Sequence, residues 1–287
     1  MTNITRIGVV GCGLMGSGIA EVCARAGLDV TVREIDDVAL ASGRARIDAS
    51  LDWAVSRGKL AGADRDAARE RLGFTVDLDD LADSDVVIEA ATENPGLKAA
   101  VFAELDRVVK RPDAILATNT SSIPIVQVAR TTARPAQVIG LHFFNPAPVQ
   151  KLVELIPSVL TSPQTTSQAH AFADRLGKTA IMAADRSGFV VNALLVPYLL
   201  AAIRMVEAGH ATLDDIDTGM VLGCAHPMGP LRLADLIGLG TVQAIAESMY
   251  EEFKEPLYAA PPLLRRMTAA GNLGRKTGQG FYDYQER

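Results

Sequence analysis

The sequence is poor in the residues that build metal centres and redox sites. Its three cysteines, Cys12, Cys23 and Cys224, are scattered without the spacing of a metal-ligand set. An odd number of unclustered cysteines suits a reducing compartment. Cys12 lies inside a glycine-rich turn, where any small side chain suffices, so we assign it no redox role. We therefore expect no bound metal.

The sequence also lacks an excess of positive charge and a long apolar run. Its formal net charge of −6 argues against a general role in binding nucleic acids or membrane surfaces, and an anionic substrate would need a local basic patch. The most apolar stretch, residues 189–203, is too short to span a membrane and contains Asn192 and Pro197. A strand pattern begins at Arg6 and leaves no room for a signal peptide. We expect a cytoplasmic protein.

The most informative stretch that is present is the glycine-rich run at residues 7–16, which is typical of a strand, a tight turn and the first turn of a helix. Gly11 allows the turn, Gly13 lets the backbone approach a pyrophosphate, and Gly16 lets the helix pack closely on the strand. The helix N-terminus presents free N–H groups to the phosphates. The residues assigned to the cofactor here are Gly11, Gly13, Leu14, Met15 and Gly16. A purely structural glycine turn is the alternative.

An acidic residue follows the second expected strand. Glu34 comes 18 residues after Gly16, close to the spacing expected for a carboxylate on the adenosine ribose hydroxyls of a dinucleotide. A carboxylate there repels the 2′-phosphate of NADP, so we predict NAD as the cofactor. Arg33 stands beside it, and although strand alternation points its side chain elsewhere, use of NADP at a disadvantage stays open.

Short apolar segments alternate with helical patterns through the first two thirds of the chain. This alternation is typical of an α/β fold with a Rossmann-type, doubly wound and mostly parallel sheet. Strands are expected at residues 6–10, 29–33, 85–89, 114–118, 137–142, 151–156 and about 178–183. Between the second and third lies a polar insert at about 37–80, predicted as a helical hairpin with helices at 38–57 and 64–72 and its turn at Gly58 and Gly62. A plain dinucleotide domain does not need this insert, so we expect it to reach over a ligand.

The strand pattern ends near residue 185. Helices are expected beyond it, at residues 189–208, 212–222, 230–252 and 261–270. The sequence therefore predicts a dinucleotide-binding domain at 1–185 and a smaller all-α domain at 186–287.

Two polar residues stand in apolar strands. His142 lies at the carboxyl end of a buried segment, the edge where open parallel sheets bind ligands. In the next segment both faces are apolar, so Glu154 is expected to be buried, and a buried carboxylate needs a partner. His142 is the obvious one. A carboxylate fixes the tautomer of an imidazole and stabilises its protonated form, as a general base for an alcohol proton requires. A structural ion pair is the alternative.

Two further polar groups fit a hydride-transfer site, which needs hydrogen-bond donors on the substrate oxygen. Residues 119–122, Asn-Thr-Ser-Ser, follow an expected strand, and a serine there either serves the site or caps the next helix. Asn192 interrupts an apolar helix and is expected to share a face with Phe189 and Val196. It either serves the site or satisfies neighbouring backbone groups.

The chain resembles the NAD-dependent 3-hydroxyacyl-CoA dehydrogenases of the short, 3-hydroxybutyryl-CoA type. The resemblance runs from end to end and includes the motifs at residues 119–122 (Asn-Thr-Ser-Ser), 141–146 (Leu-His-Phe-Phe-Asn-Pro), 151–154 (Lys-Leu-Val-Glu), 187–192 (Ser-Gly-Phe-Val-Val-Asn), 227–230 (Pro-Met-Gly-Pro) and 276–282 (Lys-Thr-Gly-Gln-Gly-Phe-Tyr). The spacings between these motifs also fit the family.

The resemblance implies that His142 is the catalytic base, oriented by Glu154, with Ser121 and Asn192 on the substrate oxygen. The residues that it implies in or near the cofactor pocket are Glu34, Glu93, Lys98, Ser121, Asn145 and Lys276. It also implies that the hairpin contacts coenzyme A through Ser50, and Ser121 is assigned to the substrate as well. The family often has lysine seven residues after Ser50, where this chain has Arg57, and either cation can meet a phosphate. A homodimer formed by the helical domain is implied too.

The predicted activity is hydride transfer between NAD(H) and C3 of a 3-hydroxyacyl-CoA, with 3-hydroxybutyryl-CoA and acetoacetyl-CoA as the expected pair. One alternative is a dehydrogenase of a free hydroxy acid or sugar acid, against which the cationic insert argues. Another is a non-catalytic NAD-binding protein. Acyl-chain length, the physiological direction and the pathway do not follow from the sequence.

Overall fold

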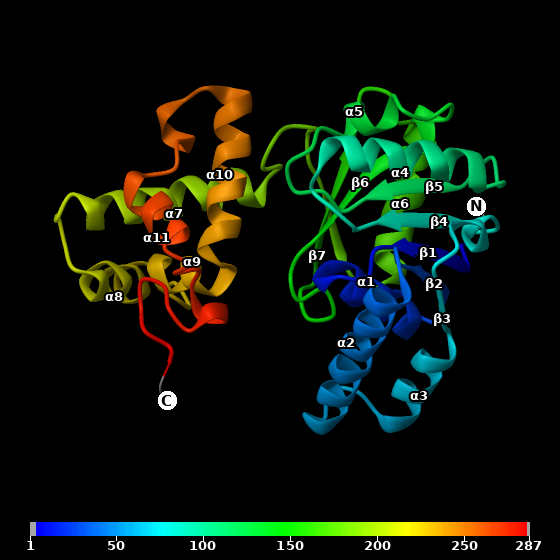
Figure 1. The fold of residues 1–287 in the computed structure, drawn as a ribbon, viewed down its shortest axis with the longest axis horizontal. Helices are drawn as coiled ribbons and strands as arrows, with labels where there is room; N and C mark the ends of the chain where they lie inside the picture. Colours follow the sequence, from blue (N-terminus) through cyan, green and yellow to red (C-terminus); the bar gives the residue numbers. More distant parts are fainter. Residues whose placement is uncertain (1–3, 286–287) are drawn as a thin grey trace. The chain divides into compact units, whose positions relative to one another are not determined.

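The computed structural model describes residues 4–285, which fold into two compact units. The first unit ends at Arg186 and the second begins at Ser187. The first is built around a β-sheet and the second is helical, as the ribbon in Figure 1 shows. The α/β fold class predicted from the alternating pattern is therefore correct.

The first unit contains an eight-stranded sheet in the order β3-β2-β1-β4-β5-β6-β7-β8. Neighbouring strands are parallel except β6 and β7, which are antiparallel. The strands are β1 (Arg6–Val10), β2 (Asp29–Arg33), β3 (Leu72–Thr75), β4 (Val86–Glu89), β5 (Ile115–Thr118), β6 (Val138–Phe143), β7 (Leu152–Pro157) and β8 (Thr179–Met182). Central strands are buried on both faces, which explains their nearly continuous apolar runs.

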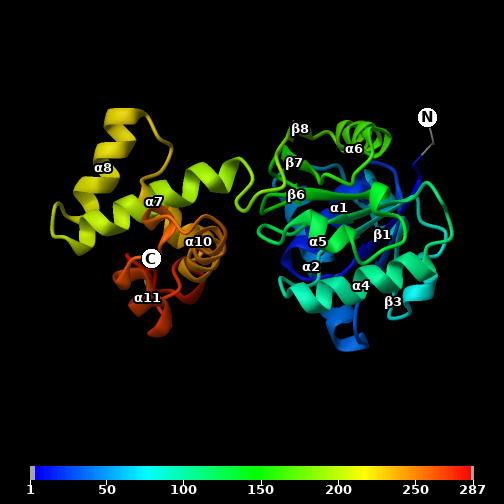
Figure 2. The same cartoon turned by 90° about the horizontal axis from the view of Figure 1, so that it is seen from above.

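Helices cover both faces of this sheet, as Figure 2 shows. Helices α1 (Leu14–Arg25) and α6 (Pro163–Arg175) contribute to one continuous apolar core with residues such as Ile7 and Val9 of β1. Helices α4 (Pro95–Val108) and α5 (Ile125–Ala129) lie on the other face, with the short helix η1 (Leu78–Leu81) beside α4, and the short helix η2 (Pro135–Gln137) leads into β6. The start of α4 follows the usual rules, since Asn94 accepts the N–H of Leu97 and proline occupies the first turn.

The predicted helical hairpin is formed by α2 (Asp37–Ser56) and α3 (Gly62–Glu70), which project from the β3 end of the sheet in Figure 1. The connection between the two helices contains Gly58 at φ +66°. Gly62 was expected in this connection as well, but that is wrong, because it is the first residue of α3. The chain then forms β3. Its first residue, Leu72, was expected in the second hairpin helix, and the rest of the strand was not predicted. Strand β3 pairs with β2 and so returns the insert to the edge of the sheet.

The second unit consists of α7 (Val191–Glu207), α8 (Leu213–Cys224), α9 (Pro230–Ile237), α10 (Leu239–Phe253) and α11 (Pro262–Ala269), with the short helices η3 (Pro256–Tyr258) and η4 (Arg275–Thr277). The single helix predicted at 230–252 is wrong. Gly238 adopts φ +100° and divides it into α9 and α10, because that backbone conformation cannot continue a right-handed helix. Within residues 4–285, no helix has both the length and the apolar character needed to cross a membrane.

Candidate active site

The glycine-rich turn has the geometry that its sequence predicts. Gly11 adopts φ +90°, and a Cβ on it would lie 2.6 Å from the Cα of Ala91. A Cβ on Gly16 would collide with the carbonyl oxygen of Gly11, so α1 approaches the turn as closely as the chain allows. Gly13 is exposed, faces open space and precedes α1 without a side-chain cap. The turn therefore forms a cradle with an uncapped helix N-terminus, and these residues fit the phosphates of a dinucleotide.

Glu34 is held at this turn. Its Oε1 accepts the N–H of Cys12 at 2.5 Å, and its Oε2 accepts the N–H of Ile35 at 3.0 Å. Arg33 is directed away from the turn, since its Nε donates to the carbonyl oxygen of Val76 at 3.3 Å. The carboxylate therefore stands beside the cradle while the neighbouring cation is engaged near β3.

His142 and Glu154 are directly opposed residues on the antiparallel strands β6 and β7. The Nδ1 of His142 lies 2.6 Å from Oε2 of Glu154, and the two side chains are 7% and 0% exposed. Antiparallel pairing places opposed side chains on the same face, so the register itself creates this contact. Nδ1 is therefore the ring nitrogen that the carboxylate holds, which fixes the orientation of the imidazole.

The end of β6 is fixed by the strand beside it. Asn119, which follows β5, accepts the N–H of Phe143 through its Oδ1 at 2.8 Å. The ring of Phe144 meets the imidazole of His142 edge-on, with 4.7 Å between the ring centroids. These contacts hold the backbone on the carboxyl side of His142 and limit the orientations of its ring.

Ser121 is bound to Glu93 and does not cap α5. Oε1 of Glu93 accepts the N–H of Ser121 at 2.6 Å, its hydroxyl at 2.9 Å and the hydroxyl of Thr120 at 3.0 Å. The first N–H groups of α5 instead donate to the carboxylate of Asp185, at 2.6 and 2.9 Å. The helix-cap alternative for Ser121 is therefore wrong, and Ser121 and Glu93 form one polar group.

A buried ion pair lies next to this group. Its lysine, Lys98, was among the expected site residues, but its carboxylate, Glu89, was not. Lys98 and Glu89 are 1% and 0% exposed and form an ion pair through Nζ and Oε2. Thr118 donates its hydroxyl to the same carboxylate oxygen at 2.9 Å, and Nζ of Lys98 lies 3.8 Å from Glu93. Oε1 of Glu89 accepts the N–H of Ala91 at 2.9 Å. Lys98 is thus placed beneath the loop that carries Glu93.

Glu89 had a signal in the sequence that went unused. It ends the apolar segment Val86–Glu89 in the same way that Glu154 interrupts the apolar strand β7. The register pairs Glu89 with Thr118, and Thr118 with Gly140, two residues before His142. Because side chains alternate along strands, these positions put Glu89, Thr118 and His142 on one face at the carboxyl edge of the sheet. A polar row therefore crosses β4 to β7.

Other expected site residues are separate from this row. Asn145 follows β6 and is exposed, while Ser50 and Arg57 lie on and just after α2. Asn192 and Lys276 belong to the second unit, so their approach to the site stays a prediction. Asn192 is half-buried in the first turn of α7. Its predicted helical face shared with Phe189 is wrong, because Phe189 adopts φ +47° before the helix begins.

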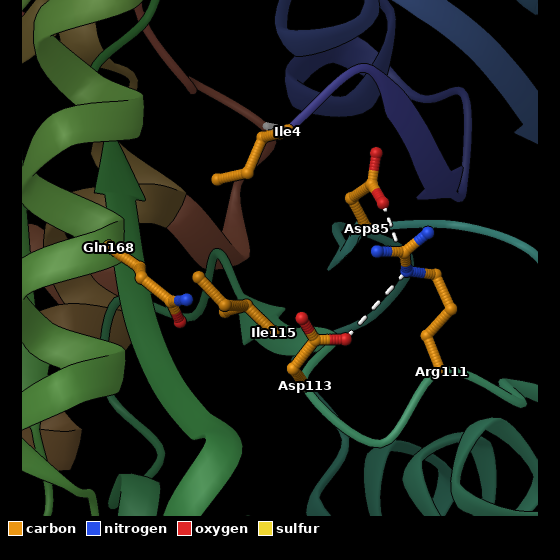
Figure 3. A pocket seen from close by; sticks show the side chains of 6 residues that line it. All are labelled: Ile4, Asp85, Arg111, Asp113, Ile115 and Gln168. Atoms are coloured by element: carbon orange, nitrogen blue, oxygen red, sulfur yellow. Dashed lines mark ion pairs between the residues drawn. The ribbon is translucent and has the colours of Figure 1, made fainter. Parts of the chain in front are cut away.

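A separate hollow lies at the opposite, amino edge of the sheet. Figure 3 shows Arg111 between the carboxylates of Asp85 and Asp113, with Ile4, Ile115 and Gln168 around the same hollow. Asp85 lies 3.0 Å from Nε of Arg111 and accepts the N–H groups of Thr5 and Arg6. Burial alone would raise the pKa of Asp85, but these backbone N–H groups and Arg111 together hold it below the ordinary value. This network joins the starts of β1 and β4 and offers no reactive group.

Within residues 4–285, no three histidine, cysteine or carboxylate side chains gather in a way that could hold a metal ion. The arrangement at the carboxyl edge instead combines a phosphate cradle, a carboxylate-bound imidazole and a hydroxyl. These are the parts needed to bind a dinucleotide and to move a proton at an alcohol or a carbonyl oxygen.

The chain matches two family models along nearly its whole length. Residues 6–186 match the model of the 3-hydroxyacyl-CoA dehydrogenase NAD binding domain, and residues 188–284 match that of the 3-hydroxyacyl-CoA dehydrogenase C-terminal domain. A 3-hydroxybutyryl-CoA dehydrogenase of Mycobacterium tuberculosis is 58% identical over 282 residues, which cover 98% of this chain and 99% of the relative.

Solved structures agree with these matches. The crystal structure of M. tuberculosis FadB2 superimposes with a TM-score of 0.98 at 58% identity and covers 99% of this chain and 100% of its own. That of the (S)-3-hydroxybutyryl-CoA dehydrogenase PaaH1 from Ralstonia eutropha has a TM-score of 0.94 at 45% identity, with coverage of 99% and 100%. With both domain models matched and full-length relatives at this identity, the chain belongs to the 3-hydroxyacyl-CoA dehydrogenase family.

Proposed function

We propose that this chain is an NAD-dependent oxidoreductase that interconverts 3-hydroxyacyl-CoA and 3-ketoacyl-CoA, with 3-hydroxybutyryl-CoA and acetoacetyl-CoA as the substrate pair. The observation that carries this proposal is the buried contact between His142 and Glu154, at the sheet edge that also bears the glycine-rich turn. Membership of the family and the names of full-length relatives support the same reaction.

In the oxidative direction, Nε2 of His142 removes the proton of the C3 hydroxyl as the hydride leaves C3. The nicotinamide, when bound, accepts this hydride. Glu154 stabilises the imidazolium that forms, because its carboxylate lies within hydrogen-bond distance of Nδ1. In the reductive direction the imidazolium returns the proton to the carbonyl oxygen, so one side chain serves both directions.

Ser121 and Asn192 are proposed to donate hydrogen bonds to the substrate oxygen. The donors hold the oxygen in line with His142 and stabilise the charge that develops on it during transfer. Glu93 positions Ser121 by accepting its backbone N–H and its hydroxyl. Because a serine has one O–H to donate, this hydroxyl exchanges Glu93 for the substrate oxygen when the substrate binds.

We propose that the first unit holds the cofactor. The turn residues Gly11, Gly13, Leu14, Met15 and Gly16 hold the phosphates, and Glu34 holds the adenosine ribose. The further proposed contacts of the cofactor in this unit are Glu93, Lys98, Ser121 and Asn145, and the second unit is proposed to add Lys276. NAD is preferred over NADP because the carboxylate at position 34 repels a 2′-phosphate, while Arg33 is engaged with Val76.

The second unit is proposed to close the substrate site and to form a homodimer. The free, unpaired state of Cys12 and Cys23 supports a reducing compartment such as the cytoplasm. Light scattering of the purified protein tests the dimer directly.

The first experiment follows NADH absorbance with acetoacetyl-CoA, and repeats it with free acetoacetate and then with NADPH. We expect consumption of NADH with the thioester, little or none with the free acid, and a marked loss of rate with NADPH. Turnover of the free acid alone would favour a dehydrogenase of free hydroxy acids. Binding of NADH without turnover of either ketone would favour a non-catalytic NAD-binding protein.

A further inference from the structure

Asn119 begins the motif at residues 119–122, and the proposed reaction assigns it no role. It directly follows β5 and is half-buried. Its side chain does not join the polar group that Ser121 forms with Glu93. Instead, its Oδ1 accepts the N–H of Phe143 at 2.8 Å, across 24 residues of sequence. The first residue of the motif therefore contacts the backbone immediately after the histidine of the site.

The carboxyl end of β6 is paired with a neighbouring strand on one side only. Toward β7 the pairing continues through Phe143. Toward β5 it ends with Thr118 opposite Gly140, two residues before His142. Phe143 is buried, and a buried N–H without an acceptor is costly. The amide oxygen of Asn119 supplies that acceptor, so a side chain extends the β5–β6 contact past the point at which backbone pairing ends.

The backbone of Asn119 is held by the strand on its other side. Its N–H donates to the carbonyl oxygen of Glu89 at 2.8 Å, and this bond continues the pairing of β4 with β5 beyond Thr118. Its position is therefore set by the centre of the sheet. Asn119 thus connects β4 and β5 to the end of β6 through one row of hydrogen bonds.

Ser121 lies two residues further along the same loop, which is held along its length. Glu93 accepts the N–H of Ser121 at 2.6 Å and the hydroxyl of Thr120 at 3.0 Å. The hydroxyl oxygen of Thr120 also accepts the N–H of Ile123 at 2.9 Å. Because so few torsion angles separate Asn119 from Ser121 and the loop is bound on both sides of them, a shift of Asn119 moves Ser121 as well.

We propose that Asn119 is a positioning residue that sets the separation between His142 and Ser121. Its side chain holds the backbone next to His142, and its own backbone leads to Ser121. This inference rests on the proposed function, in which both side chains must reach one substrate oxygen. Proton transfer and a hydrogen bond at the same atom tolerate little error in this separation, since a misplacement of about 1 Å can lower a rate by about 10²-fold.

Steady-state kinetics of Asn119→Ala provide the first test. Without the acceptor for Phe143, kcat for reduction of acetoacetyl-CoA should fall by about 10- to 10²-fold. The KM values for NADH and acetoacetyl-CoA should stay near those of the wild type, because the separation matters most in the transition state. Asn119→Asp keeps an acceptor oxygen at the same position and should recover most of kcat. Each variant is measured at its own optimum pH, since an added carboxylate favours the imidazolium of His142.

Thr161→Val is the matched control, because Thr161 makes the corresponding contact at the amino end of β6. Its hydroxyl donates to the carbonyl oxygen of Val138 at 2.6 Å and accepts the N–H of Ser158 at 2.9 Å. Like Asn119→Ala, this variant should lower the melting temperature, but kcat should stay at the wild-type value. An equal loss of kcat in both variants would show a general effect of weakening β6, and the proposal would be wrong.

A double variant tests whether Asn119 acts through Ser121. In the presence of Ser121→Ala, the further loss of kcat caused by Asn119→Ala should be smaller than in the wild type, because no hydroxyl is left to be aligned with His142. The measurement is kcat at saturating NADH and acetoacetyl-CoA for the two single variants and the double variant. Fully multiplicative losses would mean that the two residues act independently, which contradicts the proposal.

Amide hydrogen exchange tests the geometry without turnover. In Asn119→Ala the N–H groups of Phe143 and Ser121 should both exchange faster than in the wild type, whereas Asn119→Asp and Thr161→Val should leave them unchanged. Unchanged exchange at Ser121 in Asn119→Ala would overturn the proposal, because the loop would then keep its position without Asn119. Failure of the proposed function has a different signature, namely no consumption of NADH with acetoacetyl-CoA by the wild type. The two failures are therefore distinguishable.

Discussion

The two edges of the sheet hold buried carboxylates in different ways. At the amino edge, Asp85 accepts backbone N–H groups of Thr5 and Arg6 and pairs with Arg111. At the carboxyl edge, Glu154 and Glu89 are turned toward His142 and Lys98. Asp85 and Glu89 each combine backbone N–H groups with a cation that stays protonated at neutral pH, whereas Glu154 binds an imidazole, which can gain and lose a proton there. All three carboxylates are buried, so burial alone does not single out Glu154, and its proposed role in the reaction rests on its imidazole partner.

The largest effect is expected from His142→Ala. Removal of the acid–base group should lower turnover of acetoacetyl-CoA by about 10³- to 10⁴-fold, while affinity for NADH stays near that of the wild type. NADH oxidation and NADH titration measure the two quantities. Turnover within a factor of a few of the wild type would show that the carboxyl-edge pair is structural, like its counterpart at the amino edge.

Glu154→Gln should have the next largest effect. An amide at Nδ1 does not stabilise an imidazolium, so turnover should fall by about 10²- to 10³-fold with little change in KM. The measurement is kcat at saturating NADH and acetoacetyl-CoA. An unchanged kcat would mean that His142 works without its carboxylate, and the mechanism proposed for the pair would be wrong.

Glu89→Gln should act mainly on stability. It leaves the buried ammonium of Lys98 without its counter-ion, and breaking a buried pair in this way costs about 3 kcal/mol of unfolding free energy. Urea unfolding measures the loss. The double variant Glu89→Gln with Lys98→Met should recover part of it, because no buried charge then remains. If the double variant recovers stability but not affinity for NADH, then the ammonium of Lys98 is needed for cofactor binding and not for packing.

The smallest effect is expected at the amino edge, from Asp85→Asn. The pKa of Asp85 is lowered in the folded protein, so its contribution is fully present above the ordinary carboxyl pKa of about 3.9 and is lost as the pH falls through the lower, folded-state value. Stability at pH 7 should fall by about 1–2 kcal/mol, with turnover unchanged. The stabilities of the two proteins should converge as the pH falls below the folded-state pKa of Asp85, and a stability difference that does not depend on pH would contradict this explanation.

Strong apolar periodicity made most of the sheet predictable. The seven expected strands are all present. The central ones are buried apolar segments, and of the seven only β8 has no buried residue. Strand β3 was missed because it has four residues, contains Gly73 and is only partly buried at the sheet edge. The break at Gly238 was missed because the residues on both sides of it continue an amphipathic helical pattern, and only the backbone conformation shows the interruption.

The site was predictable where one contact followed from strand pairing. His142 and Glu154 could be paired from two neighbouring segments because each stood alone among apolar residues. The contact between Glu93 and Ser121 could not, since it joins two loops that are distant in the sequence and have no periodicity. Glu89 ended an expected strand, but nothing in the local pattern indicated that its partner would be Lys98, nine residues away on a helix.

The hairpin insert is packed against the core on one side and exposed on the other. Ile47 and Leu51 of α2 belong to the same apolar core as α1 and β1, and β3 returns the insert to the sheet by pairing with β2. The insert is therefore part of the cooperative core and is not a separate flap. Substitutions on the exposed side of α2, at Trp53 or Arg57, therefore change the surface of the insert without disturbing the packing on which its fold depends.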